Sequence, residues 1–464
     1  MPGNLSSAIT DFAAGLAFED LSPAAVDAAR RATLDAIGVM AAASGTSAEA
    51  APFVQQSIAL ATGGRCTILG RRERVSAPMA ALANGAMSHA LDYEDVFDAA
   101  PCHPNASAIP AGLAMAQHVG GVSGRSFLAA VVAGCEIACR IALSVRDSLE
   151  ASAWYPPPVL GAHGAAVVAA RLLGGDSRMM RDTLSLTMMQ HNAPAEIRHD
   201  AHTTLRATRE AFPAHAAVSS AMLAAAGVRG FEDPLDGRGG FFQQFSEGRR
   251  DETELVRDAE SRLHIEALSF KRWPTCRGTH AAIEMARTLV AEDGLDWRQV
   301  ASVDVVVSPL QRMLAEPASR KRAPSTLIDA KFSLPFTIAV AFVKGEVTLG
   351  ALQPPILRDE DVLAVARRVS VQFREDREAA AGTTEKMRVR LRSGRCIELA
   401  CPESADGIAA PLPDSVLLQK FLDCIGRSAA PPPADLAREV AHRILSLDDE
   451  PDVGRLIDRL FPGD

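Results

Sequence analysis

The sequence is poor in aromatic residues and in lysine, and both shortages bear on the fold. Aromatic residues make up 5% of the 464 positions, with only two tyrosines, and lysine occurs six times. Hydrophobic residues still account for 48%, and alanine and leucine supply most of them. This composition predicts helices packed through small side chains, because a sheet of this size would be richer in aromatic residues.

Long uncharged apolar runs are also missing. None reaches the roughly 18 residues that a membrane-spanning helix needs, and the first residues lack the basic-then-apolar layout of a signal peptide. We therefore expect a cytoplasmic protein with no membrane partner. The formal charge is −9 and the basic residues are scattered, which argues against nucleic-acid binding.

The eight cysteines are dispersed and show neither zinc-ligand spacing nor the spacing of a disulfide framework. We expect them to be small buried hydrophobes, and we expect no metal site. At this length the chain should form two or three domains with a large core.

The densest polar stretch, residues 89–104, lies between two apolar segments at 77–87 and 106–119 that are typical of helices. Side chains in such a position either line a cleft or form a solvated surface loop. Because one of the two tyrosines lies here, the cleft is favoured. The polar residues are Asp92, Tyr93, Glu94, Asp95, Asp98 and His103.

A second irregular segment carries the other tyrosine, Tyr155. Three prolines follow it at 156–158, and they predict an extended path that presents Tyr155 on a rigid turn. A helix of small residues is expected to begin at Gly161, with His163 as a packed helix residue. Farther on, the polar segment 191–212 includes Arg206 and Arg209.

Basic side chains are also concentrated between residues 270 and 284. Lys271 and Arg277 flank a loop held by Pro274, and His280 falls in the first turn of the next helix, where backbone N–H groups attract anions. The segment is a candidate carboxylate-binding wall. The alternative is an ordinary linker with solvated basic side chains.

The character of the chain changes near residue 265. Alternation typical of strands appears at 301–308, 367–373 and 386–399, with an apolar helix expected at 332–342 between them. From about residue 411 the pattern is helical again. We predict a mainly α protein: a large all-α domain from residues 1–268 and 402–464, and a smaller α+β domain from residues 269–401.

Five motifs in order along the chain resemble those of the MmgE/PrpD family, which includes 2-methylcitrate dehydratase, cis-aconitate decarboxylase and iminodisuccinate epimerase. They are His89-Ala-Leu-Asp-Tyr-Glu-Asp95, His103-Pro104, Gly161-Ala-His-Gly-Ala-Ala166, Phe270-Lys-Arg-Trp-Pro-Thr-Cys-Arg-Gly-Thr-His280 and Ala330-Lys-Phe-Ser-Leu-Pro-Phe336. The resemblance implies a helical domain built from both ends of the chain, an α+β domain between them, and a homodimer. It also implies an active site at the domain interface that uses neither a metal nor an organic cofactor.

The same resemblance assigns family site positions to Asp92, His103, Lys271 and His280, and a further position to Tyr155. The chain departs from the family pattern at several points. Tyr155 stands where the lyases have a histidine, and Arg206, with Arg209 close by, stands where many members have a lysine. The Gly-Arg that normally opens the following helix reads Ala211-Phe212, and Phe336 stands where some members have a tyrosine.

The family reactions remove a proton from, or deliver one to, a carbon beside a carboxylate. The charge that develops needs fixed cations, for which Arg206, Arg209, Arg277 and Lys271 are candidates, with Tyr93 as a further substrate contact. His103, His280 and Tyr155 are the candidate proton carriers, while Asp92 is suited to orienting one of them.

Three hypotheses follow, in this order of preference. The first is a lyase that dehydrates or decarboxylates a small di- or tricarboxylate. The second is an epimerase of an iminodisuccinate-like dicarboxylate, favoured by Tyr155 because epimerisation needs an acid and a base on opposite faces. The third is a family member that only binds polycarboxylates.

Overall fold

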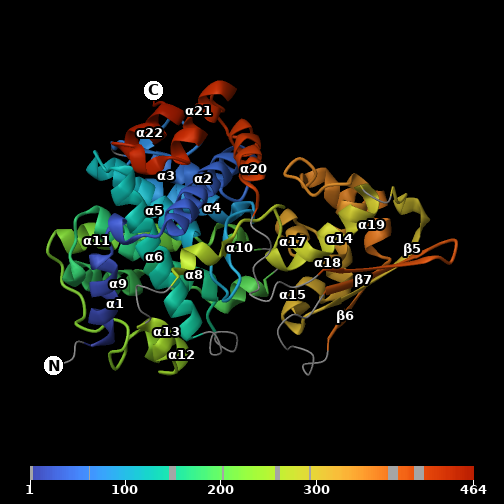
Figure 1. The fold of residues 1–464 in the computed structure, drawn as a ribbon, viewed down its shortest axis with the longest axis horizontal. Coiled ribbons are helices and arrows are strands. Elements are labelled where there is room, and N and C mark those ends of the chain that lie inside the picture. The colour runs from blue at the N-terminus through green and yellow to red at the C-terminus, as the bar shows by residue number, and fades with distance from the viewer. Residues whose placement is uncertain are drawn as a thin grey trace. The chain divides into compact units, whose positions relative to one another are not determined.

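The structure, a computed structural model, describes residues 4–61, 63–145, 153–200, 203–256, 262–291, 294–374, 385–401 and 412–463. The described residues are mainly helical, with a four-stranded mixed sheet in the C-terminal half (Figure 1). The predicted fold class is thereby confirmed. Backbone contacts divide the chain into a helical unit, residues 1–270 with 412–464, and an α+β unit, residues 271–411.

The helical unit contains most of the helices and two pairs of very short antiparallel strands. Its helices are α1 (Leu5–Gly15), α2 (Pro23–Thr46), α3 (Ala51–Ala59), α4 (Ala77–Ala90), α5 (Pro104–Val119), α6 (Gly124–Ser144), α8 (Pro156–Leu172), α9 (Ser177–Gln190), α10 (Leu205–Thr208), α11 (Ala211–Ala225), α12 (Phe241–Ser246), α13 (Glu252–Leu255), α20 (Asp414–Gly426), α21 (Ala434–Ile444) and α22 (Val453–Leu460). The strand pairs are β1 (Cys66–Thr67) with β2 (Arg74–Val75), and β3 (Val96–Phe97) with β4 (Leu268–Ser269).

Local sequence features account for the start of α2 and for an ion pair along α6. The Ser22 hydroxyl accepts a hydrogen bond from the Ala25 N–H at the start of α2, with proline at its first position. In α6, the Arg140 Nε donates to Glu136 Oε1 over 2.8 Å, an ion pair between residues four positions apart on one helix face.

The prediction for the three prolines was wrong. They form the first turn of α8, which begins at Pro156 and not at Gly161, and Tyr155 precedes it with extended backbone dihedral angles. A proline lacks an N–H, and N–H groups in the first helical turn have no intrahelical acceptor, so three prolines there cost the helix no hydrogen bond.

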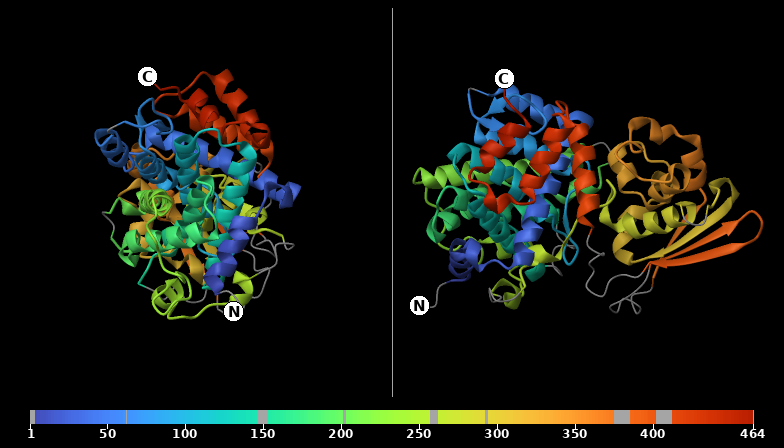
Figure 2. Two further views of the ribbon diagram at one scale, coloured as in Figure 1. Left: turned by 90° about the vertical axis from the view of Figure 1, so that its left-hand side faces the viewer. Right: turned by 45° about the horizontal axis from the view of Figure 1, so that its top comes forward.

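The core of the helical unit forms where α8 packs against α5 and α6. Helix α6 is the one helix among the described residues that is long and apolar enough to cross a membrane, yet 89% of its apolar window is buried inside the protein. Burial of that kind is what a core helix shows. At the other end of the chain, α20 lies along α2, so the C-terminal helices pack beside the N-terminal ones (Figure 2).

The α+β unit contains a sheet of strand order β6-β5-β7-β8. Its strands are β5 (Val300–Val307), β6 (Val369–Phe373), β7 (Glu385–Leu391) and β8 (Cys396–Cys401), and its helices are α14 (His280–Ala291), α15 (Arg312–Ala315), α16 (Ala318–Arg322), α17 (Leu327–Lys331), α18 (Leu334–Lys344) and α19 (Glu360–Ala366). β5 pairs parallel with β6 and antiparallel with β7. The single stretch expected at 386–399 is two strands of an antiparallel pair.

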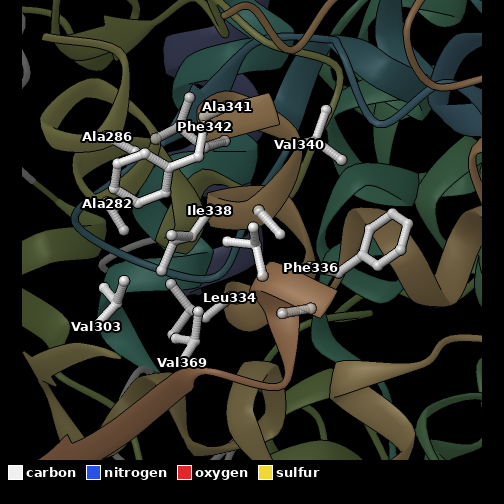
Figure 3. Close-up of a cluster of buried hydrophobic side chains, with 14 of the residues drawn as sticks. Ala282, Ala286, Val303, Leu334, Phe336, Ile338, Val340, Ala341, Phe342 and Val369 are labelled. Carbon is white, nitrogen blue, oxygen red and sulfur yellow. The ribbon is translucent and has the colours of Figure 1, made fainter. Parts of the chain in front are cut away.

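Helices α14 and α18 pack against each other and against strands of this sheet. Figure 3 shows α18 carrying apolar side chains toward Val303 of β5 and Val369 of β6. Phe336 is fully buried in α18. A tyrosine hydroxyl at this position would require a buried hydrogen-bond partner, which a phenylalanine does not.

Candidate active site

The chain leaves α4 through a sharp change of direction at Asp92. This residue has a φ of 52°, in the left-handed region that aspartate tolerates better than most residues, and its N–H donates to the carbonyl of His89 over 2.8 Å. Residues 91–98, here called the acidic loop, follow. Asp92, Glu94 and Asp95 are each at most 2% exposed, so the alternative of a solvated surface loop was wrong.

Glu94 lies between two histidines. Its Oε1 contacts the Nδ1 of His89 and lies 3.0 Å from the Nδ1 of His103. The ring centroids of the two histidines are 5.6 Å apart. The carboxylate therefore links a residue at the end of α4 to the residue that precedes α5.

The surroundings of His103 determine which of its nitrogens carries the proton. Nδ1 lies 3.0 Å from the carbonyl oxygen of Asp95 and 3.0 Å from the Glu94 carboxylate. Both oxygens act as acceptors, so Nδ1 donates and Nε2 of the neutral ring holds the lone pair. The side chain of His103 is 15% exposed, whereas those of Glu94 and His89 are buried. The neutral His103 ring thus has its lone pair on Nε2, and its side chain is the more exposed of the two histidines.

Arg209 contacts the second ring nitrogen of His89. Its Nη1 donates to His89 Nε2, and its Nε donates to Glu210 Oε1 over 3.0 Å. Glu210 also accepts from the Ser107 hydroxyl of α5. The approach is close because Gly85 of α4 faces the backbone of this segment, where an added Cβ would lie 2.6 Å from the Glu210 carbonyl oxygen.

The charge states of this network follow from burial. Burial lowers the pKa of His89 to about 3, with Arg209 acting in the same direction and Glu94 opposing it. Burial also tends to lower the pKa of Arg209, but the negative groups around it, Glu210 among them, raise it on balance. His89 is therefore neutral and Arg209 remains a cation.

Tyr155 joins the same network through Arg209. The guanidinium carbon of Arg209 lies 5.2 Å from the centroid of the Tyr155 ring, and that of Arg198 lies 4.9 Å from it. The Tyr155 N–H donates to the Ala193 carbonyl over 2.7 Å, which ties the start of α8 to the segment that carries Arg198. Two cations thus lie beside the phenol ring, and Tyr155 itself is 6% exposed.

Arg206 and Tyr93, the two other residues of the helical unit that were predicted to contact the substrate, lie at the edge of this network. Arg206 is buried, and its carbonyl accepts from Arg209 Nη1 over 3.3 Å. The Tyr93 carbonyl accepts from the Nζ of Lys420, which also lies 3.8 Å from the centroid of the Tyr93 ring. The helical unit therefore gathers Asp92, His103, Tyr155 and Arg209 in one network and places Arg206 and Tyr93 at its border.

The three remaining predicted residues belong to the α+β unit. His280 begins α14, its Nε2 lies 3.3 Å from the Thr275 carbonyl, and its ring meets Trp273 edge-on at 5.1 Å. Lys271 is 1% exposed, and Arg277 is half-buried in the turn before α14. The alternative of a solvated linker is wrong for Lys271 and His280, while the roles of all three remain predictions.

His89, Asp92 and Glu94 bring their ligand atoms within 4.8 Å of one another, as metal ligands would. In His89, however, Nε2 accepts from Arg209 and Nδ1 donates to Glu94. Both ring nitrogens are engaged, and the guanidinium already supplies a positive charge. This donor set fits a hydrogen-bonded network better than it fits a cation site.

Sequence reasoning missed His89, Glu94 and Lys420 as site-forming residues. His89 and Glu94 lie inside the stretch that was singled out, but nothing in their spacing showed that one carboxylate would bridge two histidines. Lys420 did leave a signal: it lies on the apolar face of α20 with Leu417 and Phe421, where a lysine is unexpected.

The protein consists of two units, and its helical unit contains a buried carboxylate–histidine–arginine network. Comparison with known families matches residues 7–254 to the MmgE/PrpD N-terminal domain and residues 273–445 to the MmgE/PrpD C-terminal domain. The chain belongs to the MmgE/PrpD family.

Curated relatives include cis-aconitate decarboxylases. The enzyme of Aspergillus terreus is 23% identical over 479 residues, which cover 98% of this chain and 96% of the relative. The Homo sapiens enzyme is 23% identical over 372 residues, covering 78% and 75%. The cis-aconitate decarboxylase-like protein oryM of Aspergillus oryzae is 24% identical over 421 residues, covering 85% and 84%.

Proposed function

We propose that this protein is a cofactor-independent lyase that acts on a small di- or tricarboxylate by proton transfer beside a carboxylate. The observation that carries the proposal is the arrangement at His103: Nδ1 lies 3.0 Å from both the Asp95 carbonyl oxygen and Glu94 Oε1, so Nδ1 carries the proton and Nε2 is left as the base. The distant relatives that decarboxylate cis-aconitate support the substrate class.

In the proposed reaction His103 exchanges a proton with the carbon next to the scissile group. Glu94 stabilises the imidazolium that forms, because the carboxylate lies 3.0 Å from the protonated Nδ1. Tyr155 is the proposed second proton carrier. Arg206 and Arg209 are proposed to attract the substrate carboxylates and to offset the negative charge that develops.

Lys271, Arg277 and His280 are proposed to act in the same reaction, Lys271 and Arg277 as cations for the substrate and His280 as a proton carrier. The family membership and the burial of Lys271 and His280 support this proposal. The homodimer, the cytoplasmic location and the independence from metals and cofactors remain predictions.

The test is proton NMR of the purified protein in D2O with citrate, methylcitrate, cis-aconitate and iminodisuccinate, each in a separate sample. Loss of carbon dioxide or water from one of them is expected. His442→Asn, on an exposed position of α21, is the matched control and should react like the unmodified protein. Absence of turnover with every substrate in the panel would count against the lyase.

Epimerisation of an iminodisuccinate-like dicarboxylate is the second candidate. The observation that favours it is the phenol of Tyr155 beside two cations, Arg198 and Arg209, at the position where the family resemblance implies a histidine in the lyases. In the same NMR experiment, deuterium uptake at the α-carbon without breakdown of the substrate would support epimerisation over the lyase.

A further inference from the structure

Lys420 is buried in α20, far along the chain from the acidic loop, yet it contacts that loop directly. Its Nζ lies 2.6 Å from Asp35 Oδ1 of α2 and donates to the Tyr93 carbonyl over 2.6 Å. The side chains of Lys420 and Asp35 are 4% and 1% exposed. A single ammonium group therefore joins α2, α20 and the acidic loop.

The Tyr93 ring adds a third contact. Lys420 Nζ lies 3.8 Å from the ring centroid, so the ammonium faces both the aromatic ring and the carbonyl of the same residue. Such an arrangement restricts the backbone and the side chain of Tyr93 together. Tyr93 directly precedes Glu94, the carboxylate that holds His103.

Asp95 extends the same cluster on the other side of Glu94. Its carboxyl accepts from Asn105 Nδ2 of α5 over 2.6 Å, and its carbonyl lies 3.0 Å from His103 Nδ1. Burial raises the pKa of Asp95 to about 7, with Asp35 and Glu94 adding to this effect and Asn105 and Lys420 opposing it. The positively charged Lys420 thus lies close to the buried carboxyl groups of Asp35 and Asp95.

We propose that Lys420 and Asp35 are positioning residues: they fix the acidic loop so that Glu94 and the Asp95 carbonyl hold the His103 ring with Nε2 as the base. Helix α20 thereby supports a network whose other residues in the helical unit come from the first 210 positions. The catalytic consequence rests on the proposed function, whereas the ordering of the loop does not.

The experiment compares Lys420→Met, the double variant Asp35→Asn/Lys420→Met, and the control Lys344→Met. Lys344 pairs with Asp359 over 2.7 Å on an exposed part of the α+β unit, so the control also removes a lysine–aspartate pair. Hydrogen–deuterium exchange followed by mass spectrometry reports on the acidic loop, where the Asp92 and Phe97 N–H groups donate to carbonyls.

In Lys420→Met, exchange in residues 91–98 should be about tenfold faster, the factor expected for losing one charge-assisted hydrogen bond. The single variant leaves the Asp35 carboxylate buried without the ammonium, so its Tm should fall. The double variant removes that charge, so the Tm should recover while the loop still exchanges fast. If Lys420 stabilised only the fold and did not order the loop, loop exchange in the double variant would return to the original rate as its Tm recovers.

Kinetics supply the second readout where the unmodified protein turns over a substrate of the panel. The double variant should lose about tenfold in kcat with little change in KM, since Lys420 and Asp35 act on the position of His103, which takes part in the chemical step. An unchanged kcat would overturn the positioning role. If the unmodified protein is inactive, the proposed lyase fails, while the exchange arm still decides whether Lys420 orders the loop.

Discussion

His89 and His103 share the carboxylate of Glu94 but differ in what lies on their other side. His89 is fully buried, and its second nitrogen accepts from the Arg209 guanidinium, which keeps it neutral. The side chain of His103 is 15% exposed, and we propose that its second nitrogen meets the substrate. The His89 ring is therefore fixed by hydrogen bonds on both sides, whereas His103 is the ring for which we propose proton transfer, although both are the same residue type.

His103→Asn should lower kcat by about 10²- to 10⁴-fold, because it removes the proton carrier. The fold should persist, since asparagine is a favourable residue at the position before α5 that His103 occupies. Steady-state kinetics with the substrate identified by NMR would measure the effect, with His442→Asn as control. A kcat within twofold of the unmodified value would contradict the assignment of His103 as the base.

Asp95 should make the folded state less stable as the pH rises. Its pKa is raised from 3.8 to about 7 by burial, so between these values the folded chain keeps a proton that the unfolded chain has released. Stability therefore declines as the pH rises from about 4 to 7. Asp95→Asn should remove this decline and be the more stable protein above pH 7, as measured by urea denaturation at a series of pH values.

His89 acts with the opposite sign in an overlapping range. Because burial lowers its pKa from 6.5 to about 3, the unfolded chain binds a proton there that the folded chain does not, and stability is lost as the pH falls from about 6.5 to 3. The two effects partly cancel in the unmodified protein. Asp95→Asn should therefore expose a steeper loss of stability on the acid side, and an unchanged pH profile would show that Asp95 does not hold the proton.

At the scale of single elements, the crossing of α6 and α8 depends on two glycines that face each other. A Cβ at Gly134 would lie 2.6 Å from the Gly164 carbonyl oxygen, and a Cβ at Gly164 would lie 2.6 Å from the Gly134 carbonyl oxygen. Both contacts involve backbone, which cannot give way as a flexible side chain can. The helices can approach this closely only without side chains at these positions.

Gly164→Ala should therefore lower the free energy of unfolding by about 1–3 kcal/mol, the usual range for overpacking a core. The matched control is Gly15→Ala at the end of α1, where an added Cβ meets nothing within 4 Å. Alanine there should leave stability unchanged or raise it slightly. Equal effects of the two substitutions in thermal or urea unfolding would contradict a tight crossing.

The whole helical unit depends on a contact between the two ends of the chain. Phe421 of α20 is 1% exposed, and its ring lies against Gly38 of α2, where a Cβ would come within 3.1 Å of Phe421 Cδ2. The side chains of helix α20 that face α2 thus fill space that the first 270 residues leave open. The tail is part of this unit's core, in the same way as any central helix.

Phe421→Ala should cost about 3–5 kcal/mol, the usual loss for removing a buried phenylalanine side chain. Gln419→Ala, on the exposed side of the same helix, should cost little. Urea denaturation followed by far-UV circular dichroism would compare the two variants. A small effect of Phe421→Ala would mean that α20 contributes little to the stability of the helical unit.

Much of the fold could be predicted because it follows from short-range patterns in the sequence. Ser22 and Pro23 mark the start of α2, Glu136 and Arg140 are spaced to pair along α6, and the alternation at 301–308 matches β5. The start of α8 was missed because prolines usually interrupt helices, and only the position of Pro156 in the first turn makes them acceptable. Local sequence rules fail where the effect of a residue on the backbone depends on its position within the helix or strand.

The candidate site can likewise be separated into what the sequence indicated and what only the tertiary structure shows. Residue type and order along the chain drew attention to the stretch with Asp92 and His103 and to the segments with Tyr155 and Arg209, and the family resemblance assigned site positions to Asp92, His103 and Tyr155. The bridging of two histidines by Glu94 and the anchoring of Tyr93 by Lys420 depend on distances between residues that lie up to 327 positions apart. Such distances arise only when helices pack, because a carboxylate or an ammonium has no preferred partner until burial removes the water that would otherwise solvate it.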